Sequence, residues 1–328
     1  MTTLSRHMQH NGMIHRFALF AACVATTLTA IVATGCGGKM PLKTGSSGAP
    51  YEVTVMGDST GIVARVLSAA MPGLPQEEPM FDVVEVKGHG NGAAYSTSRN
   101  IVKIDIDPKQ YAQTMVKYAV NVHAEPQIVV RVCAPSAAAL RRQLPDKALV
   151  QLLCRHEMGA ETARLSKRHN PEAERTIEQM FGCRMLVSPT MKASLKGKDF
   201  LWLTDNASTG MTSICIYTSE NRDSVMQANI KGETDAMHMT TTPNSTTVTC
   251  TYRHGSKVTI TRGLWEMLGD AMGGPFVSHA IIMPHGRGVV VAEAFVYAPE
   301  MRKRNLIRRA EASLYTLRTD GKNSTERK

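Results

Sequence analysis

The spacing of apolar residues predicts alternating strands and helices over the first half of the chain. Residues 100–107 alternate, with Val102, Ile104 and Ile106 on one side and charged residues on the other, as in a half-buried strand. Asn170-Pro171 and Gly182 bound a helix over 171–181, because they supply a cap, a first-turn proline and a terminating glycine. The other predicted strands are 51–56, 80–86, 118–123 and 127–133, and the other predicted helices are 62–71, 136–144 and 146–168.

Strands dominate the second half. Residues 247–253 and 257–262 alternate cleanly and are joined by His254-Gly255-Ser256, which predicts a hairpin. A second hairpin joins 276–283 to 289–298, and its second strand is apolar on both faces, as expected for a central strand covered on both sides. Two strands (200–203 and 213–218) and a helix (221–230) precede them.

Two helices show a stripe of residues expected to face a core. In helix 146–168 the stripe consists of Leu149, Leu153, His156, Ala160 and Ala163. In the last helix, 301–317, Arg304, Arg308 and Glu311 are expected to face water, opposite a stripe of Leu306, Ile307, Ala310, Leu314 and Leu317. Together the elements predict an α+β fold: mixed and antiparallel sheets with hairpins in the C-terminal half, packed against helices and closed by an amphipathic C-terminal helix.

Composition divides the chain into a short leader region and one long folded region. No flexible linker interrupts residues 51–318, so we expect one domain there, with two lobes (51–190 and 195–318) that share one core. Residues 36–50 are rich in Gly, Ser and Pro and are expected to form a flexible tether. The polar, basic residues 319–328 are expected to be a disordered tail.

The N-terminus has the pattern of a secretory signal peptide, which we assign to residues 1–35. Arg6 and Arg16 precede 18 uncharged residues, 17–34, and no acidic residue precedes them. Four threonines dilute that run, whereas a membrane-spanning helix needs about 20 mainly apolar residues. The run ends in Ala33-Thr34-Gly35-Cys36, which resembles the lipobox of bacterial lipoproteins, although Ala33 stands where that motif usually has a larger aliphatic residue.

The resemblance to a lipobox implies that Cys36 receives a diacylglycerol and becomes the first residue of the mature chain. The alternatives are an ordinary cleaved signal with an incidental cysteine, or an uncleaved anchor. Gly37 after the cysteine resembles an outer-membrane address, and Gly38-Lys39, in place of an acidic run, favours the periplasmic face. We therefore expect an outer-membrane protein of the cell envelope, attached to the membrane by its lipid and bound to an unknown envelope protein or ligand.

Overall composition is that of an ordinary globular protein. The chain has 328 residues, of which 43% are hydrophobic and 20% charged. The formal net charge is +10, and nine basic residues lie in the last 28 positions. This basic end is either a solvated tail or a contact for anionic headgroups, peptidoglycan or an acidic partner. Nucleic acid is not an expected partner, because the chain is exported and its 5% aromatic content leaves little for base stacking.

The cysteines contain no metal or redox motif. Once Cys23 in the signal and Cys36 are set aside, five cysteines remain, and none shows C-x-x-C spacing. Cys133, Cys215 and Cys250 lie in apolar strand patterns and are expected to be buried free thiols. Disulfides can form in an exported protein, but the cysteine spacing indicates none. We also expect no cofactor.

Gly57-Asp58-Ser59, directly after the first predicted strand, resembles the nucleophile block of GDS-type esterases. Asp235 and His238 have the spacing of that family's D-x-x-H pair, and a histidine base oriented by a carboxylate can activate a serine. However, His238 lies far from the C-terminus, and the family's Gly-x-Asn-Asp block is absent. A periplasmic serine hydrolase using Ser59, His238 and Asp235 is therefore the alternative function, and the simpler interpretation is a turn capped by Asp58 or Ser59.

Three other kinds of short motif bear on function. Met237-His238-Met239 offers soft ligands suited to copper(I), but no further His or Met stands at helical or hairpin spacing, so we predict no metal site. The paired glycines of Gly273-Gly274-Pro275 would let backbone approach a ligand, although a tight turn between strands is the simpler interpretation. Asp58-Ser59-Thr60 and Asp223-Ser224-Val225 also resemble bacterial O-glycosylation sites.

Many motifs spread over the mature chain resemble one known family. They include RGLWEM (262–267), GD (269–270), MGGPFVSH (272–279), FVYAP (295–299), KRNL (303–306), PYEV (50–53), FDV (81–83), RNI (99–101), HNPE (169–172), DFLW (199–202) and RDSVM (222–226). The chain resembles an uncharacterised lipoprotein family of the Bacteroidetes, classed as a domain of unknown function. The resemblance implies a lipid-anchored envelope protein, and our leading hypothesis is that it has a non-enzymatic binding or structural role. It brings no known activity and no catalytic residue.

Overall fold

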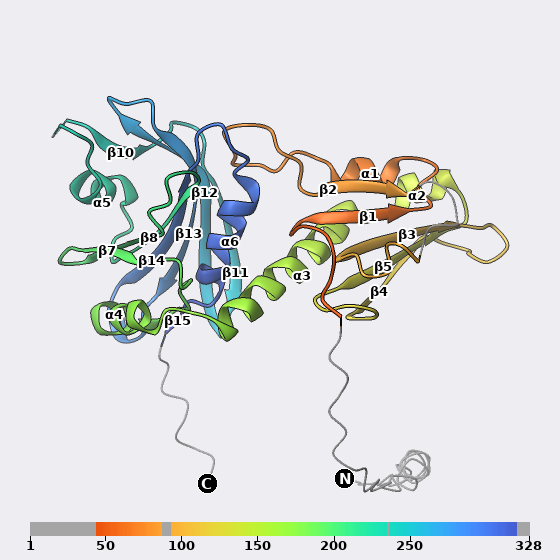
Figure 1. The fold of residues 1–328 in the computed structure, drawn as a ribbon, viewed down its shortest axis with the longest axis horizontal. Coiled ribbons are helices and arrows are strands. Elements are labelled where there is room, and N and C mark those ends of the chain that lie inside the picture. Colours follow the sequence, from red (N-terminus) through yellow and green to blue (C-terminus); the bar gives the residue numbers. More distant parts are fainter. Residues whose placement is uncertain (1–43, 87–92, 235, 320–328) are drawn as a thin grey trace, which may run out of the picture. The chain divides into compact units, whose positions relative to one another are not determined.

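The computed structural model describes residues 44–86, 93–234 and 236–319 (Figure 1). These residues form an α+β fold built on two large sheets. The first sheet has the strand order β2-β1-β3-β5-β4, in which only β4 is antiparallel to its neighbour. Its strands are β1 (Glu52–Met56), β2 (Asp82–Val86), β3 (Asn100–Ile106), β4 (Met115–Val120) and β5 (Ile128–Ala134).

The helices that pack on the first sheet are α1 (Ile62–Leu67), α2 (Ala137–Gln143) and α3 (Asp146–Lys167). The central parallel strands are apolar, and Val53 and Val130 share a core with Leu153 of α3. The predicted cap of α2 is confirmed, because Ser136 Oγ accepts a hydrogen bond from the Ala139 amide at 3.1 Å.

The second sheet has eight strands, and all of its neighbouring strands are antiparallel. The strand order is β10-β12-β13-β14-β9-β8-β7, and β11 pairs with the other end of β12. The strands are β7 (Ala193–Lys196), β8 (Phe200–Thr204), β9 (Met211–Tyr217), β10 (His238–Thr241), β11 (Thr247–Arg253), β12 (Ser256–Leu268), β13 (Gly273–Ile282) and β14 (Val289–Tyr297). Both predicted hairpins are confirmed.

Helices cover the two faces of this sheet unequally. On one face Ile177 of α4 (Pro171–Phe181) and Leu314 of α6 (Arg304–Tyr315) share a core with β9, β12, β13 and β14. On the other face a smaller core includes Met226 of α5 (Arg222–Asn229) together with Trp265 and Phe295. A two-stranded ribbon, β6 (Cys183–Arg184) and β15 (Arg318–Thr319), and a 3-10 turn (Pro284–Gly286) complete the described elements.

Two features differ from the expected domain plan. Residues 44–50 were assigned to the tether, but they lie against the first sheet, where the Ser47 amide donates to the Thr97 carbonyl at 2.9 Å. Helix α4 was placed in the first lobe, but its apolar side packs into the core of the second sheet. The division between the lobes therefore falls near residue 168, and each sheet has a core of its own.

The expected exposure of charged residues on the last helix is wrong. Glu311 is 0% exposed and pairs with Arg262 of β12, and Arg304 is buried against Asp82 of β2. In α3, Glu157 is buried and accepts hydrogen bonds from Arg99 at 2.8 Å, whereas Ala163 of the predicted stripe is exposed. Helical periodicity assigns charge to the outside, and these residues face inward because other elements supply partners for them.

Two strand-level expectations also need correction. Gly273-Gly274-Pro275 is part of β13 rather than a turn. A Cβ on Gly274 would lie 2.0 Å from the Val296 carbonyl oxygen, so glycine is required for close strand packing beside Trp265, not for a ligand. Cys133 and Cys215 are buried as expected, but Cys250 is exposed, because no described element covers the face of β11 on which it lies.

Candidate ligand-binding cleft

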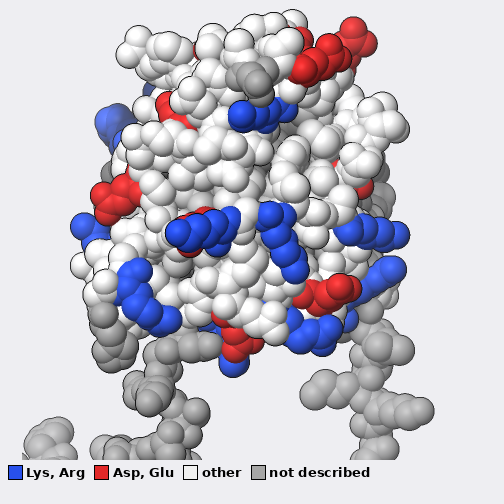
Figure 2. All heavy atoms as spheres, turned by 90° about the vertical axis from the view of Figure 1, so that its left-hand side faces the viewer, with Lys and Arg blue, Asp and Glu red and all other residues white. Residues whose placement is uncertain are grey.

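Charge on the surface does not gather into one basic patch on the face that carries β7, α4 and α5. Figure 2 shows Lys and Arg side chains mainly in the lower half of this face, with Asp and Glu side chains between them. Exposed lysines there include Lys192, Lys196 and Lys198 around β7. Surface charge on this face therefore indicates no binding site, whereas the cavities offer candidates.

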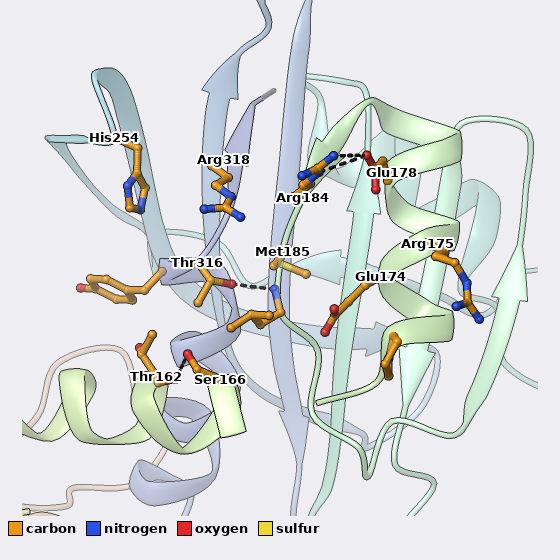
Figure 3. Close-up of a pocket in the computed structure, with 13 residues that line it drawn as sticks. Thr162, Ser166, Glu174, Arg175, Glu178, Arg184, Met185, His254, Thr316 and Arg318 are labelled. Carbon is orange, nitrogen blue, oxygen red and sulfur yellow. Dashed lines mark hydrogen bonds and ion pairs between the residues drawn. The ribbon is translucent and has the colours of Figure 1, made fainter. Parts of the chain in front are cut away.

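One cavity, of about 700 Å³, lies beside α4, β6, β15 and the end of α3 (Figure 3). Several of its polar and charged side chains hold these elements together. Arg184 pairs with Glu178 at 2.7 Å, and the Leu186 amide donates to Thr316 Oγ1 at 2.8 Å. Glu174 lies 2.9 Å from the His169 ring and accepts from the Val187 amide. These contacts connect neighbouring elements of the fold, so we do not take this cavity as the candidate binding site.

A cleft on the second sheet has a different character. We call the side of the sheet that faces α5 the open face. The strand register places Thr261, Ser278 and Glu293 in one row across β12, β13 and β14. The next row contains Thr259, Ala280, Val291 and Tyr217. Neighbouring side chains in a row are about 4.8 Å apart, so hydroxyl, carboxyl and apolar groups lie side by side.

The part of the open face that α5 and β10 leave uncovered forms a cleft of about 490 Å³. Its lining combines apolar side chains with many hydroxyl-bearing ones, so it offers both apolar surface and hydrogen-bonding groups to a small molecule. Lys257 and Glu220 stand among the lining residues as opposite charges. The other lining residues used below are Tyr217, Arg222, Thr241, Thr259, Thr261, Phe276, Ser278, Ala280, Val289 and Val291.

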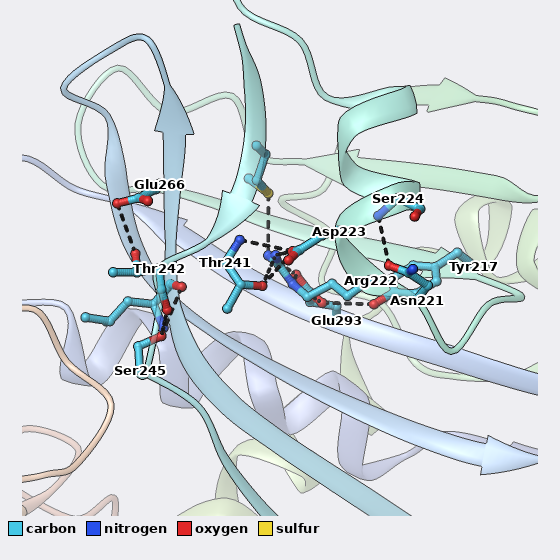
Figure 4. Close-up of polar contacts among 12 residues, drawn as sticks. Tyr217, Asn221, Arg222, Asp223, Ser224, Thr241, Thr242, Ser245, Glu266 and Glu293 are labelled. Atoms are coloured by element: carbon cyan, nitrogen blue, oxygen red, sulfur yellow. Dashed lines mark hydrogen bonds and ion pairs between the residues drawn. The ribbon is translucent and has the colours of Figure 1, made fainter.

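The floor of the cleft holds a buried ion pair (Figure 4). Glu293 is 0% exposed and receives hydrogen bonds from Arg222 Nε at 3.0 Å and Arg222 Nη2 at 2.8 Å. The Tyr217 hydroxyl donates to the second carboxylate oxygen at 3.0 Å. The Arg222 guanidinium also stacks over Phe276, with Cζ 4.0 Å from the ring centroid. The arginine is therefore held on two sides.

The protonation equilibria follow from this burial. Burial raises the pKa of the Glu293 carboxyl above its ordinary value, and the Arg222 guanidinium opposes that rise. Burial, together with the neighbouring Glu293 charge, also raises the pKa of Tyr217 well above its ordinary value. Burial lowers the pKa of Arg222, but Glu293, Tyr217 and Asp223 together outweigh this effect and the net pKa is raised. The pair is neutral overall, so the floor of the cleft presents no net charge.

Helix α5 positions the arginine. Asn221 caps the helix, since its side-chain oxygen accepts from the Ser224 amide at 3.1 Å, and Arg222 is the first helical residue. Asp223 accepts from the Thr241 amide at 3.0 Å and from its hydroxyl at 2.6 Å, which ties α5 to β10. Arg222 Nη1 donates to both Asp223 and Thr241. The guanidinium is thus fully engaged and cannot turn freely into the cleft.

The structure does not bring the proposed hydrolase residues together. Ser59 follows β1 of the first sheet, whereas His238 begins β10 at the edge of the second sheet. The His238 ring lies 3.0 Å from the Ala236 carbonyl oxygen instead. Asp235 lies outside the described residues. Ser59 and His238 therefore do not pair as a nucleophile and its general base.

The simpler interpretation of Gly57-Asp58-Ser59 is confirmed. The Asp58 carboxylate accepts from the Thr60 hydroxyl at 2.8 Å and from the Ala64 amide in the first turn of α1 at 2.9 Å, so it caps the helix, although Gly61 occupies the N-cap position. Gly57 has φ +77°, and a Cβ there would lie 2.5 Å from the Ile104 carbonyl oxygen. The loop lines a cavity of about 700 Å³ at the carboxyl ends of β1 and β3, where Ser59 is exposed. Ser224, the other serine with a glycosylation-like neighbour, is also exposed.

Cys36, the predicted lipid site, lies outside the described residues. Of the soft ligands considered for copper, Met239 is buried and its sulfur lies 3.6 Å from Arg222 Nη2. Among residues 44–86, 93–234 and 236–319, no three His, Cys, Asp or Glu side chains are grouped to hold a metal ion.

Comparison with known proteins follows the division between the two sheets. Residues 46–166 match the profile of a domain of unknown function (DUF8532), and residues 170–316 match a second one (DUF4837). Both halves of the chain match domains of unknown function. The resemblance drawn from the sequence motifs is confirmed at this level. No curated protein matches the chain.

A crystal structure from Bacteroides thetaiotaomicron is weakly similar. It is 14% identical, with a TM-score of 0.23, and the similarity covers 43% of this chain and 46% of that one. All residues of the cleft, from Tyr217 to Glu293, belong to the DUF4837 segment.

No helix in the described part of the chain is long and apolar enough to cross a membrane.

Sequence reasoning missed the central residues of the cleft. Arg222 belongs to a motif that carried the family resemblance, but Glu293 and Tyr217 were not singled out. The available indication was one carboxylate within the apolar run Val289–Tyr297, where a charge without a partner would be costly to bury. The partner could not be named, because Arg222 lies 71 positions away and reaches β14 only in the folded chain.

Proposed function

We propose that this chain is a lipid-anchored protein of the bacterial cell envelope that binds a ligand in the cleft on the open face and does not catalyse a reaction. The proposal has two parts, the anchor and the cleft, and each is tested separately. The segments that match domains of unknown function are compatible with it and supply no activity.

The anchor is supported by the sequence alone. A cationic N-terminus, an uncharged run over 17–34 and the small residues before Cys36 make up a lipoprotein signal. Several acyl chains on one cysteine would hold the protein on the membrane almost permanently, since each buried methylene contributes about 0.8 kcal/mol. Gly37 and the absence of an acidic run after it favour the periplasmic face of the outer membrane.

Metabolic labelling with palmitate tests the anchor. We expect label in the wild-type chain and in Cys23→Ala, a matched control inside the apolar run, and none in Cys36→Ala. Equal labelling of all three proteins would exclude lipid attachment at Cys36. Membrane fractions of the same cells should lose the Cys36→Ala protein to the soluble fraction.

The observation that carries the binding proposal is the neutral, preorganised floor of the cleft. Glu293 and Arg222 neutralise each other, and Tyr217 completes the network, so the buried floor itself carries no unpaired charge, while Lys257 and Glu220 bring opposite charges to the lining. The hydroxyls of Thr261 and Ser278 lie beside this floor and can both donate and accept hydrogen bonds. Buried ion pairs of this kind contribute little to stability and often mark sites.

The ligand suited to this cleft is uncharged and combines an apolar portion with hydroxyl groups. Ala280, Val289 and Val291 supply the apolar surface, and the row of hydroxyls supplies orientation. The volume of about 490 Å³ is within the usual range for small-molecule sites.

Saturation-transfer NMR with phenyl β-glucoside as the probe tests the cleft. The probe carries an apolar ring and a set of hydroxyls. We expect transfer from the wild-type protein and from Ala119→Trp, which adds the same side chain on exposed β4. Ala280→Trp fills the cleft, so transfer should disappear. Absence of transfer from the wild type, or equal transfer from all three proteins, would contradict the proposed ligand class.

A further inference from the structure

The edge strand β11 differs from the edge strands β2, β4 and β7. Edge strands are normally protected by charged residues, because their free N–H and C=O groups can pair with another chain. Edge strand β7 ends in Lys196, β2 carries Asp82 and Glu85, and β4 carries Lys117. The first six residues of β11, Thr247 to Tyr252, carry no charge.

The outer side of β11 offers a regular set of backbone groups. Strands β11 and β12 are joined by a two-residue turn, His254-Gly255, in which both residues have positive φ. The pair flanking that turn, Arg253 and Ser256, is hydrogen-bonded, and such pairs alternate along an antiparallel ladder. Residues 247, 249, 251 and 253 therefore bond to β12. The N–H and C=O groups of 248, 250 and 252 point to the sheet edge, where no described strand lies beside them.

The side chains of the same three residues are also exposed. Val248 is 62% exposed and Tyr252 is 77% exposed, and Cys250 between them is exposed as well. All three lie on the open face, since their register partners are Thr261, Thr259 and Lys257. An uncovered apolar row on an unprotected edge is a site for strand addition.

We propose that β11 pairs antiparallel with β11 of a second copy of this chain, with the two-fold axis at Cys250. Cys250 is the middle residue of the seven in the strand, Thr247–Arg253. In this register Cys250 faces Cys250 of the partner, and Val248 of each copy faces Tyr252 of the other. A β-branched residue opposite an aromatic one is a favourable cross-strand pair, and here it occurs twice.

Hydrogen bonding and charge agree with this register. The outward groups of 248, 250 and 252 meet the same groups of the partner, which gives three hydrogen-bonded pairs and about six backbone hydrogen bonds. The single charge of the strand, Arg253, falls opposite uncharged Thr247 of the other copy, so no like charges meet. Arg253 is also held on the other face, where its guanidinium stacks on Tyr315 with Cζ 4.4 Å from the ring centroid.

The pairing would join two eight-stranded sheets into one continuous sheet. The open faces of the two copies would then be continuous, and the partner's β11 would lie beyond the chain's own β11 on the Thr259 side of each cleft. This inference rests on the strand edge alone and does not depend on the ligand proposed for the cleft.

The first experiment uses Cys250 as a reporter in intact cells that express the full-length chain. A short bismaleimide should join two copies, because the thiols face each other across the axis. The cross-linked dimer should disappear in Cys250→Ser, whereas the dimer mass measured by light scattering in detergent should persist in that variant. A wild-type chain that is monomeric by light scattering and uncrosslinked would overturn the proposal.

The second experiment tests the register by exchanging charges. Val248→Lys and Tyr252→Glu should each weaken dimerisation by roughly tenfold, because each loses both cross-strand pairs. The double variant should dimerise again, since Lys at 248 then faces Glu at 252 of the partner. Recovery also shows that the chain folds with both substitutions present. Tyr118→Lys, on edge strand β4, is the control and should leave the dimer unchanged. Dimers that resist both single changes, or a double variant no better than the single ones, would exclude this interface.

Discussion

Replacing Arg222 by Met tests whether the carboxylate of Glu293 depends on its buried partner. Methionine keeps much of the length of the side chain but donates no hydrogen bond and carries no charge. The variant leaves Glu293, which is 0% exposed, with only the Tyr217 hydroxyl as a donor. Removing one member of a buried pair typically costs about 3–5 kcal/mol, so we expect a loss of that size at pH 8. Urea unfolding followed by circular dichroism measures it.

The loss should depend on pH in a defined direction. Without Arg222, burial is opposed only by the hydrogen bond from Tyr217, so the folded-state pKa of Glu293 rises further above the unfolded value of about 4.3. A group whose folded pKa is raised contributes stability that is complete below the unfolded pKa and is lost as pH rises through the folded pKa. The penalty of Arg222→Met should therefore be largest at pH 8 and should shrink towards pH 5.

Two further variants make this test decisive. Adding Glu293→Gln to Arg222→Met removes the charge without a partner, so most of the loss at pH 8 should be recovered and its pH dependence should vanish. Arg164→Met breaks a helix pair in which the arginine is 48% exposed, and it should cost only about 0.2–0.5 kcal/mol. A loss below about 1 kcal/mol for Arg222→Met, or an equal loss at pH 5 and pH 8, would refute the reasoning.

Three other predictions concern the fold. Gly274→Ala places a Cβ 2.0 Å from a carbonyl oxygen of β14 and should destabilise the protein by about 1–3 kcal/mol. In Gly159→Ala, on α3, the new Cβ meets no atom within 4 Å, so this variant should be more stable than the wild type by about 0.5–1 kcal/mol. Urea unfolding measures both changes. Asp58→Ala removes the acceptor of a helix amide and should cost about 0.5–2 kcal/mol in the same assay, and Ser59→Ala should change nothing. Burial would raise the pKa of the Glu311 carboxyl, but its charged and hydrogen-bonding neighbours, Arg262 first among them, lower the net pKa. The ionised Glu311 therefore contributes fully to the stability of the fold above its unfolded-state pKa of about 4.3, and this stabilisation is lost in more acidic solution. Glu311→Gln should therefore be less stable than the wild type at pH 7, with a difference that narrows on acidification; a constant difference would contradict the assignment.

Local patterns predicted the elements well where the cause is local. Asn170, Pro171 and Gly182 define α4 at both ends, and the Asn170 side chain accepts from the Ala173 amide as a cap should. The two hairpins follow from alternation on both sides of turn residues, which needs no distant partner. Short edge strands such as β7 and β10 were not predicted, because four residues carry too little periodicity.

The candidate site could not be predicted in the same way. The exposed Cys250 and the buried Glu293 both lie in strands that alternate or are apolar, and pattern alone assigned burial to the first and did not mark the second. Whether a strand face is covered depends on which helix crosses it. Helix α5 covers only part of the open face, so the rest forms the cleft and the exposed edge at β11.

The amino-acid sequence by itself determined the leader pattern, the α+β class, most helix and strand boundaries and the resemblance to domains of unknown function. Only the tertiary structure decided which charges are buried: Glu311 faces inward because Arg262 meets it from β12, and Glu293 is buried because Arg222 reaches it from α5. The physical reason is that periodicity reports the side of an element that faces a core, whereas burial of a charge depends on a partner supplied from elsewhere in the chain.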